Sequence, residues 1–214
     1  YVLLWGWGVM NSTALKEAQA TGFPRDRMYG SWWSGAEPDV KDVGEGAKGY
    51  HAVMMQHGAQ PQARIVKDIL AQVHDKGQGT GPREEVGSVL YMRGLVSAMV
   101  AVEGVRRAQD RFSKGKPVTG EQARWGLENL ELDQKKLDTL GFGDVLRPFG
   151  TSCADHLGAA GWARIETWDG AKWVAAPDWI QADGQILKPM IKSSAQRYAA
   201  DKKLEPRAPA DCQS

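Results

Sequence analysis

The sequence predicts an α/β fold, because its first third alternates strand-like and helix-like segments. Apolar or mixed runs of strand length occur at residues 1–4, 27–29 and 50–55. An amphipathic segment at residues 13–21 separates the first two runs, in the order of a β-α-β unit. The carboxyl ends of parallel strands in such a unit lie at one edge of the sheet, where open α/β sheets bind small ligands.

The helix after the first strand has recognisable signals at both ends. We expect Asn11 or Ser12 to cap it, because both side chains can accept a hydrogen bond from the first turn. Leu15 and Ala18 are expected to face the core. Gly22 is expected to end the helix, since glycine adopts the left-handed conformation at low cost.

The middle of the chain is mainly helical. Residues 34–49 are polar and rich in glycine, so we expect a loop with at most one short helix. Apolar residues then recur at helical spacing, Thr119 and Gln122 form a capping-box pattern, and Gly141 closes a short final turn. The helical segments predicted on these grounds are residues 65–73, 88–108, 119–132 and 133–140.

The last third of the chain returns to strands. Residues 162–168 alternate in polarity, and a second run follows at 171–175. The intervening Asp169 and Gly170 form the dipeptide most typical of a tight hairpin turn, so a hairpin is predicted. Residues 186–198 are weakly helical.

Four of the nine tryptophans follow the first two predicted strands, as Trp5, Trp7, Trp32 and Trp33. A single tryptophan is more often part of a core, because large aromatic side chains dominate cores. Four at two neighbouring strand ends favour a flat aromatic wall for a small molecule instead. Glycines such as Gly8 would let that molecule approach the backbone.

The composition excludes several classes of function. The net charge is +1 and the basic residues are dispersed, which gives no electrostatic case for nucleic acid or an anionic membrane. No apolar stretch approaches the ~20 residues that cross a bilayer. We therefore expect neither a nucleic-acid partner nor a transmembrane segment.

No catalytic or cofactor signature is complete. The glycines at residues 6–8 are followed by Asn11 where a dinucleotide-binding loop needs its third glycine. Residues 150–154 resemble a nucleophile elbow but lack the flanking strand and helix, and Cys153 with His156 lacks the geometry of a thiol catalyst. No metal-ligand spacing links the histidines His51, His57, His74 and His156. We expect no enzyme activity, no cofactor and no metal.

Two further features leave alternatives open. Cys153 and Cys212 suit inert thiols in an intracellular protein or a disulfide in an exported one. The chain begins with Tyr1 inside a predicted strand, without an initiator methionine or a signal peptide, so we expect a mature fragment or a truncation.

Several motifs together resemble a known family. Their order and spacing are similar to the carboxyl-terminal half of periplasmic solute-binding proteins of branched-chain amino acid (Leu/Ile/Val) ABC importers. The likeness extends to about Trp179, and the amino-terminal half of the family has no counterpart here. The segments that carry it are residues 5–12, 15–18, 21–24, 87–91, 98–108 and 168–173.

The resemblance implies a type I periplasmic-binding-protein fold, with two lobes that have parallel sheets and trap a ligand between them by a hinge motion. It assigns residues 1–57 to ligand-binding lobe 2 and residues 58–160 to lobe 1, which is mostly helical. Residues 161–183 would form a hairpin that returns to lobe 2, and 184–214 a carboxyl-terminal tail. The fold would be incomplete in this chain.

The resemblance also implies a location and partners. The protein would be exported to the periplasm, where Cys153 and Cys212 would form a disulfide that holds the tail. It would act as a monomer that delivers its solute to a membrane permease.

The same resemblance assigns a ligand site. Trp7, before Trp5, corresponds to an aromatic residue against the ligand, and Tyr91 or Leu90 to a contribution from the other lobe. Trp32 stands where amino-acid binders carry an acid, so Glu37 or Asp39 would have to replace that acid. The residues expected to bind the ligand are Trp5, Trp7, Gly8, Trp32, Trp33, Glu37 and Tyr91.

The identity of the solute stays open among three classes. A branched-chain or other amino acid is the family default, an aromatic acid would stack on the rings, and a quaternary amine would gain cation–π energy. Two other functions remain as alternatives: a ligand-sensing receptor domain with the same fold, and a flavodoxin-like enzyme.

Overall fold

The computed structural model describes residues 1–156 and 161–205. The chain divides into two compact units, each assembled from three segments. Unit 1 comprises Tyr1–Ser97, Asp133–Arg147 and Ala163–Ile180. Unit 2 comprises Ala98–Leu132, Pro148–Trp162 and Gln181–Ser214.

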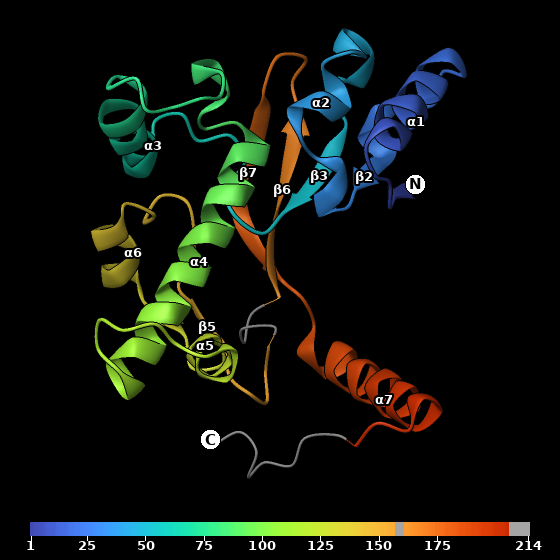
Figure 1. Ribbon diagram of the computed structural model, residues 1–214. Helices are drawn as coiled ribbons and strands as arrows, with labels where there is room; N and C mark the ends of the chain where they lie inside the picture. The colour runs from blue at the N-terminus through green and yellow to red at the C-terminus, as the bar shows by residue number, and fades with distance from the viewer. Residues whose placement is uncertain (157–160, 206–214) are drawn as a thin grey trace. The chain divides into compact units, whose positions relative to one another are not determined.

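Unit 1 is built around a mixed five-stranded sheet with the strand order β1-β2-β3-β6-β7 (Figure 1). The first three strands are parallel, with Leu4 paired to Gly30 and Gly30 to Ala52. The strands are β1 (Val2–Leu4), β2 (Met28–Gly30), β3 (His51–Met54), β6 (Trp162–Trp168) and β7 (Trp173–Gln181).

The predicted α/β class and the predicted strands are confirmed, but the sheet is not parallel throughout. β6 pairs antiparallel with β3, so that Val53 lies opposite Ile165. The hairpin strands reach the sheet only after a long helical excursion, and sequence periodicity does not encode the direction in which they enter.

Helix α1 (Val9–Ala20) starts four residues earlier than the predicted 13–21 segment. The expected capping by Asn11 or Ser12 is wrong, because the residue at the cap position is Gly8, which has no side chain to act. Asn11 instead lies inside the helix, fully buried, where its amide donates to the Asp39 carboxylate at 2.7 Å in the short helix α2 (Glu37–Val40). Leu15 and Ala18 are buried as predicted.

The end of α1 confirms the glycine signal. Gly22 has a φ of 70°, in the left-handed region. The Phe23 N–H donates to the Ala18 carbonyl at 2.8 Å, and the Gly22 N–H donates to the Gln19 carbonyl at 3.2 Å. This pair of bonds is a Schellman motif, which satisfies carbonyls that the helix itself leaves unpaired.

The other predicted helices are present, but the helix predicted over residues 119–132 ends at Leu127, and Glu131–Leu132 form a strand instead. A π-helical turn at Leu70–His74 extends α3, and the left-handed Gly141 closes α6. Thr119 and Gln122 exchange the two hydrogen bonds of the predicted capping box at the start of α5. The helices are α2 (Glu37–Val40), α3 (Arg64–Ile69), α4 (Val89–Phe112), α5 (Gly120–Leu127), α6 (Gln134–Leu140) and α7 (Gly184–Lys202).

Unit 2 contains elements that the sequence did not reveal. β4 (Glu131–Leu132) pairs antiparallel with β5 (Phe149–Gly150). Strands of two residues are too short to leave a periodic pattern.

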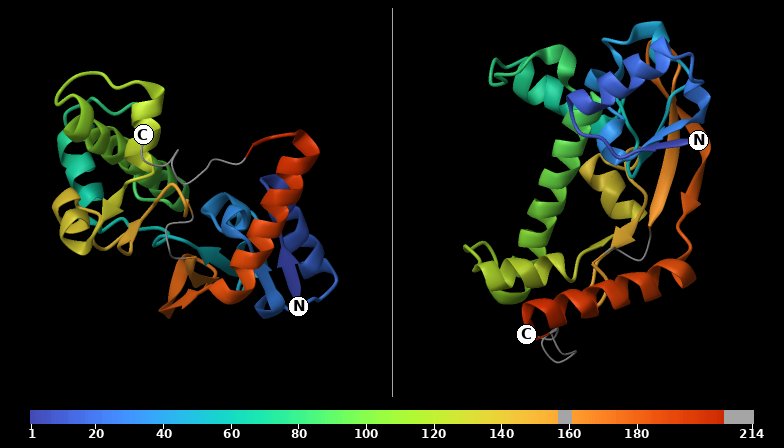
Figure 2. Two further views of the ribbon diagram at one scale, coloured as in Figure 1. Left: turned by 90° about the horizontal axis from the view of Figure 1, so that it is seen from below. Right: turned by 90° about the vertical axis from the view of Figure 1, so that its right-hand side faces the viewer.

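The predicted weak helical tail is present as the continuous helix α7 (Figure 2), which has no buried residue.

The core of unit 1 packs α1 and the loop after β2 against the sheet. Tyr50 is fully buried, and its hydroxyl donates to the Ser34 carbonyl at 2.9 Å. Trp168 and Trp173, which flank the hairpin turn, are buried in the same cluster with ring centroids 5.5 Å apart. For these two tryptophans the ordinary core role therefore applies.

Two glycines of unit 1 are expected to respond to alanine in opposite directions. Gly22→Ala should lower the free energy of unfolding by about 1 kcal/mol, because an L-residue is strained at its φ of 70°. Gly94→Ala, in the interior of α4 with open space around it, should raise that free energy by about 0.5–1 kcal/mol. Urea unfolding of both variants measures the difference, and effects of the same sign would contradict the motif.

Candidate ligand-binding site

The carboxyl ends of β1, β2 and β3 lie at one edge of the unit 1 sheet, and three segments follow them. Ser34, in the second segment, joins the first two segments. Its hydroxyl oxygen accepts a hydrogen bond from the Gly6 N–H at 3.3 Å. As a donor, the hydroxyl lies 3.3 Å from the Leu4 carbonyl and 3.2 Å from the Gly6 carbonyl. These bonds fix the relative positions of the two tryptophan-bearing segments.

Three of the predicted tryptophans are brought together at this edge, and we refer to Trp7, Trp32 and Trp33 as the tryptophan rim. The ring centroids of Trp7 and Trp33 are 4.8 Å apart, as are those of Trp32 and Trp33. Trp7 is 65% exposed and Trp33 is 43% exposed, while Trp32 packs partly against the core. The rim thus presents apolar ring surface to solvent.

The neighbouring predicted residues differ from the rim. Trp5 is 82% exposed, and no ring of the described residues stacks on it. Gly8 occupies the cap position of α1 with a φ of 54°. Glycine suits this position because it adopts a positive φ at low cost.

Two residues that the sequence reasoning missed hold Trp32. The indole Nε1–H of Trp32 donates to Gln56 Oε1 at 3.2 Å. The guanidinium of Arg93 lies 4.5 Å from the centre of the Trp32 ring, and its Nη2 donates to the Gly35 carbonyl at 3.2 Å. The sequence signals were weak: Gln56 follows a strand end, and Arg93 interrupts an apolar helix face.

Gln56 and Arg93 are both buried, at 3% and 8% exposure. In the part of the chain that the structure describes, the Gln56 Nε2 and the Arg93 Nε have no hydrogen-bond partner. Buried polar atoms are normally paired, so each such atom calls for an explanation.

The two carboxylates that were candidates to contact a ligand are engaged elsewhere. Both oxygens of Glu37 lie within 3.2 Å of the Val89 N–H, where they stabilise the start of α4. Asp39 accepts hydrogen bonds from the Asn11 amide at 2.7 Å and from the Ala36 N–H at 2.8 Å. Burial nevertheless raises the pKa of Asp39 above its usual value.

Tyr91 lies in the first turn of α4, two residues after the Glu37 contact. Its N–H donates to the Ser88 hydroxyl at 3.4 Å, and its side chain is half-buried. Tyr91 therefore belongs to unit 1, and it lies in the same first turn of α4 that Glu37 stabilises.

Three carboxylates act on the charge of Arg93, the residue that stacks on Trp32. Burial lowers the pKa of Arg93, while the charges of Asp39, Glu37 and Glu166 act in the opposite direction. Glu166 is itself buried and accepts a hydrogen bond from the Gly58 N–H at 3.0 Å. Desolvation first, and then the charge of Glu37, raise the pKa of Glu166, against the opposing effects of the Gly58 bond and the charges of Arg164 and Arg93.

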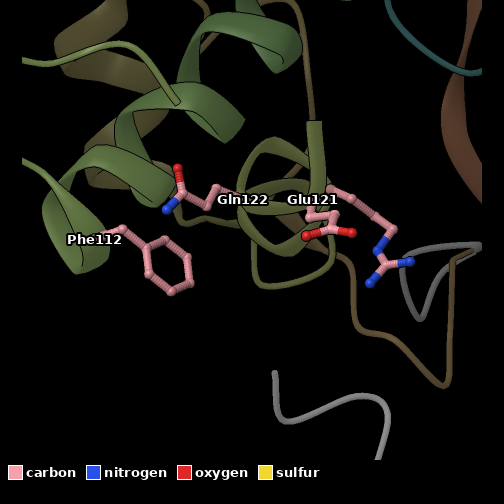
Figure 3. Close-up of a pocket in the computed structure, with 4 residues that line it drawn as sticks. Phe112, Glu121 and Gln122 are labelled. Carbon is pink, nitrogen blue, oxygen red and sulfur yellow. The ribbon is translucent and has the colours of Figure 1, made fainter. Parts of the chain in front are cut away.

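A separate pocket of about 280 Å³ lies in unit 2. Figure 3 shows Phe112 from the end of α4 and Gln122 from α5 at this pocket, with Glu121 and Arg124 also lining it. None of the residues predicted to bind a ligand is among them.

Three remaining expectations concern the rest of the chain. Cys212 lies outside the described residues, so its pairing with Cys153 stays a prediction. Within residues 1–156 and 161–205, no group of three or more His, Cys, Asp or Glu is arranged to hold a metal ion. No helix in those ranges combines the length and the apolar character needed to cross a membrane.

Comparison with known proteins gives a consistent result. The family model for periplasmic binding proteins matches residues 1–172. A structure from the Pseudomonas fluorescens group, described as an ABC transporter permease, is 39% identical with a TM-score of 0.89, covering 98% of this chain and 50% of its own. No curated protein matches the chain.

More distant structures share the fold. A branched-chain amino acid ABC transporter protein from Thermus thermophilus, solved with bound valine, is 21% identical with a TM-score of 0.66 over 88% of this chain and 48% of its own. A substrate-binding protein of an ABC transporter from Aeropyrum pernix is 13% identical with a TM-score of 0.65 over 87% and 46%. The chain thus spans about half the length of the solved proteins that it matches.

Replacing the buried Glu166 with glutamine should stabilise the protein in a pH-dependent way. Glu166→Gln keeps an oxygen to accept from the Gly58 N–H and removes the charge. The pKa of Glu166 in the folded state is raised above 4.5, so the folded protein keeps this proton to a higher pH than the unfolded chain does. The stability of the unchanged protein therefore falls as the pH rises from 4.5 toward the folded-state pKa.

The advantage of Glu166→Gln over the unchanged chain should therefore be small at pH 4 and grow as the pH rises above 4.5. Thermal unfolding of both proteins across this range measures it. An advantage that is constant or shrinks with rising pH would show that desolvation does not dominate at Glu166.

Proposed function

This chain belongs to the periplasmic binding protein family, and on that premise we propose that it forms part of the solute-binding component of an ABC importer. The component works in the periplasm without catalysis. It captures a small solute and delivers it to a membrane permease. Fixed apolar surface and directed polar groups provide this function, and no reacting group is required.

The tryptophan rim is the observation that supports this proposal most directly. Trp7 and Trp33 expose large ring areas at the carboxyl edge of a sheet, although burying such area is favourable by about 25 cal/mol per Å². Exposed apolar surface in a defined place is typical of a binding site. The Ser34 hydroxyl accepts from the Gly6 N–H and the Asn11 amide donates to the Trp33 carbonyl, so the segments that carry these rings are held and the rim is preformed.

We extend the proposal to the two-lobe organisation. Residues 1–57 and the hairpin at 161–183 would belong to the ligand-binding lobe 2, because β6 and β7 continue the sheet of β1, β2 and β3. Residues 58–160 would contribute to lobe 1, with residues 58–97 and 133–147 packed in the same compact unit as β1, β2 and β3. Residues 184–214 would be the tail. A hinge motion of the whole protein would then close it on the solute.

Within lobe 2 we propose that Trp7, Trp32 and Trp33 contact the solute, with Trp5 and Gly8 beside them. Glu37 would act through α4, whose first turn carries Tyr91. The Thermus thermophilus protein contains valine, so an amino acid remains one candidate solute, next to an aromatic acid and a quaternary amine.

A thermal-shift screen against amino acids, aromatic acids, amides and betaines should identify a stabilising compound, since a ligand that binds only the folded state raises its stability. In calorimetry with that compound, Trp7→Ala should weaken binding by about tenfold, or about 1.4 kcal/mol. Trp125→Ala, which removes an indole from unit 2, serves as the matched control.

Affinity should be unchanged in the Trp125→Ala variant. Equal affinities for the unchanged chain and the Trp7→Ala variant would reject the rim as the binding site.

A further inference from the structure

A histidine and two arginines gather around one tryptophan in unit 1, and we refer to His57, Arg147, Arg164 and Trp179 as the junction cluster. The rings of His57 and Trp179 meet edge to face, with centroids 5.6 Å apart. The guanidinium carbons of Arg147 and Arg164 each lie 5.7 Å from the centre of the Trp179 ring. The cluster thus draws on all three chain segments that make up unit 1.

The junction cluster lies where the chain leaves and re-enters unit 1. Arg147 is the last residue of one unit 1 segment. Arg164 and Trp179 each lie one residue from an end of another segment, Ala163–Ile180. Three of the connections between the units therefore start at a residue of the cluster or next to one, and a change in its packing acts on all three.

Arg164 contacts the imidazole of His57 in a way that requires the neutral ring. The Nη1 of Arg164 lies 3.0 Å from Nδ1 and 3.1 Å from Nε2 of His57, while its Nε donates to the Ala176 carbonyl of β7. A guanidinium has only donors, and a neutral imidazole has one nitrogen that accepts. In the protonated ring both nitrogens carry hydrogen, so the contact becomes a repulsion between two cations.

The surroundings of His57 also favour its neutral form. Burial is the main cause that lowers the pKa of His57, and the charge of Arg164 lowers it further, while Asp144 acts in the opposite direction. Arg147 adds a second guanidinium on the same tryptophan. Protonation of His57 therefore costs more in the folded protein than in the unfolded chain, and this cost arises as the pH falls below 6.5.

His57 also lies next to the residue that holds Trp32 of the tryptophan rim. On one side of it, Gln56 Oε1 accepts from the Trp32 indole at 3.2 Å. On the other side, the Gly58 N–H donates to the buried carboxylate of Glu166 at 3.0 Å. Because each of these three consecutive residues has its own partner, a displacement of His57 also moves Gln56.

We infer that His57 is a pH-sensitive switch, whose protonation breaks the contact with Arg164 and so changes the packing of both the junction cluster and Trp32. At neutral pH the imidazole is uncharged and accepts from Arg164. In mild acid the imidazolium moves away from the arginines, and residues 56–58 move with it. The inference goes beyond the proposed function, because it concerns the free protein and requires no solute.

The test uses fluorine NMR of the purified chain labelled with fluorotryptophan, from about pH 7.5 to about pH 5. The signals of Trp179 and Trp32 are identified by their loss in Trp179→Phe and Trp32→Phe. We expect both signals to shift with one common midpoint below pH 6.5. His57→Gln keeps an acceptor for Arg164 but cannot be protonated, so it should abolish both shifts.

His74→Gln, which changes a histidine in the turn that follows α3, is the matched control and should leave both shifts in place. If the Trp179 shift persists in His57→Gln, another group titrates and the inference fails. If the Trp179 signal shifts but the Trp32 signal does not, the rim is not coupled to His57 and the inference fails as well.

Arg164→Gln provides an independent variant, whose folding is verified by circular dichroism like that of His57→Gln. Removing the guanidinium charge should move the common midpoint toward 6.5, because that charge lowers the pKa of His57. A midpoint that stays where it is in the unchanged chain would overturn the inference, whether or not His57→Gln folds. Since no solute is added, these results do not depend on whether the rim is the binding site.

Discussion

The tryptophan rim depends on a few buried hydrogen bonds that join the ends of β1 and β2. Ser34 bonds the backbone of the first segment, and the Asn11 amide donates both to the Trp33 carbonyl at 3.2 Å and to Asp39. The Ser34, Asn11 and Asp39 side chains are buried, so water competes little for their hydrogen bonds. The apolar rings can remain exposed because their backbone is fixed from below by polar contacts.

Features encoded by neighbouring residues were predictable from the sequence. Gly22 and Gly141 end helices because the left-handed conformation is a local property, and Thr119 caps α5 through a residue only three positions away. The antiparallel entry of β6 was not predictable, since it depends on a partner more than 100 residues distant. Asn11 shows the same limit: its type fits a cap, but burial against Asp39 determines its role.

The candidate site also has a part that the sequence predicts and a part that it does not. The order of strands and tryptophans in the sequence was sufficient to bring Trp7 and Trp33 to one edge. The partners of Trp32 were not evident, because Gln56 and Arg93 reach it from other elements. Glu37 is an acid in a segment that follows a site strand, yet its carboxylate accepts a hydrogen bond from an N–H 52 residues away. Residue type and position cannot show which lone pairs are already occupied.

The uneven burial of the indoles has a spectroscopic consequence. Trp168 and Trp173 lie in an apolar core, whereas Trp7 and Trp33 face solvent. Buried indoles emit at shorter wavelength than hydrated ones, so one chain contains two populations of intrinsic fluorophore. External quenchers reach Trp7 and Trp33 at the sheet edge and do not reach Trp168 and Trp173, whose emission reports on the integrity of the core.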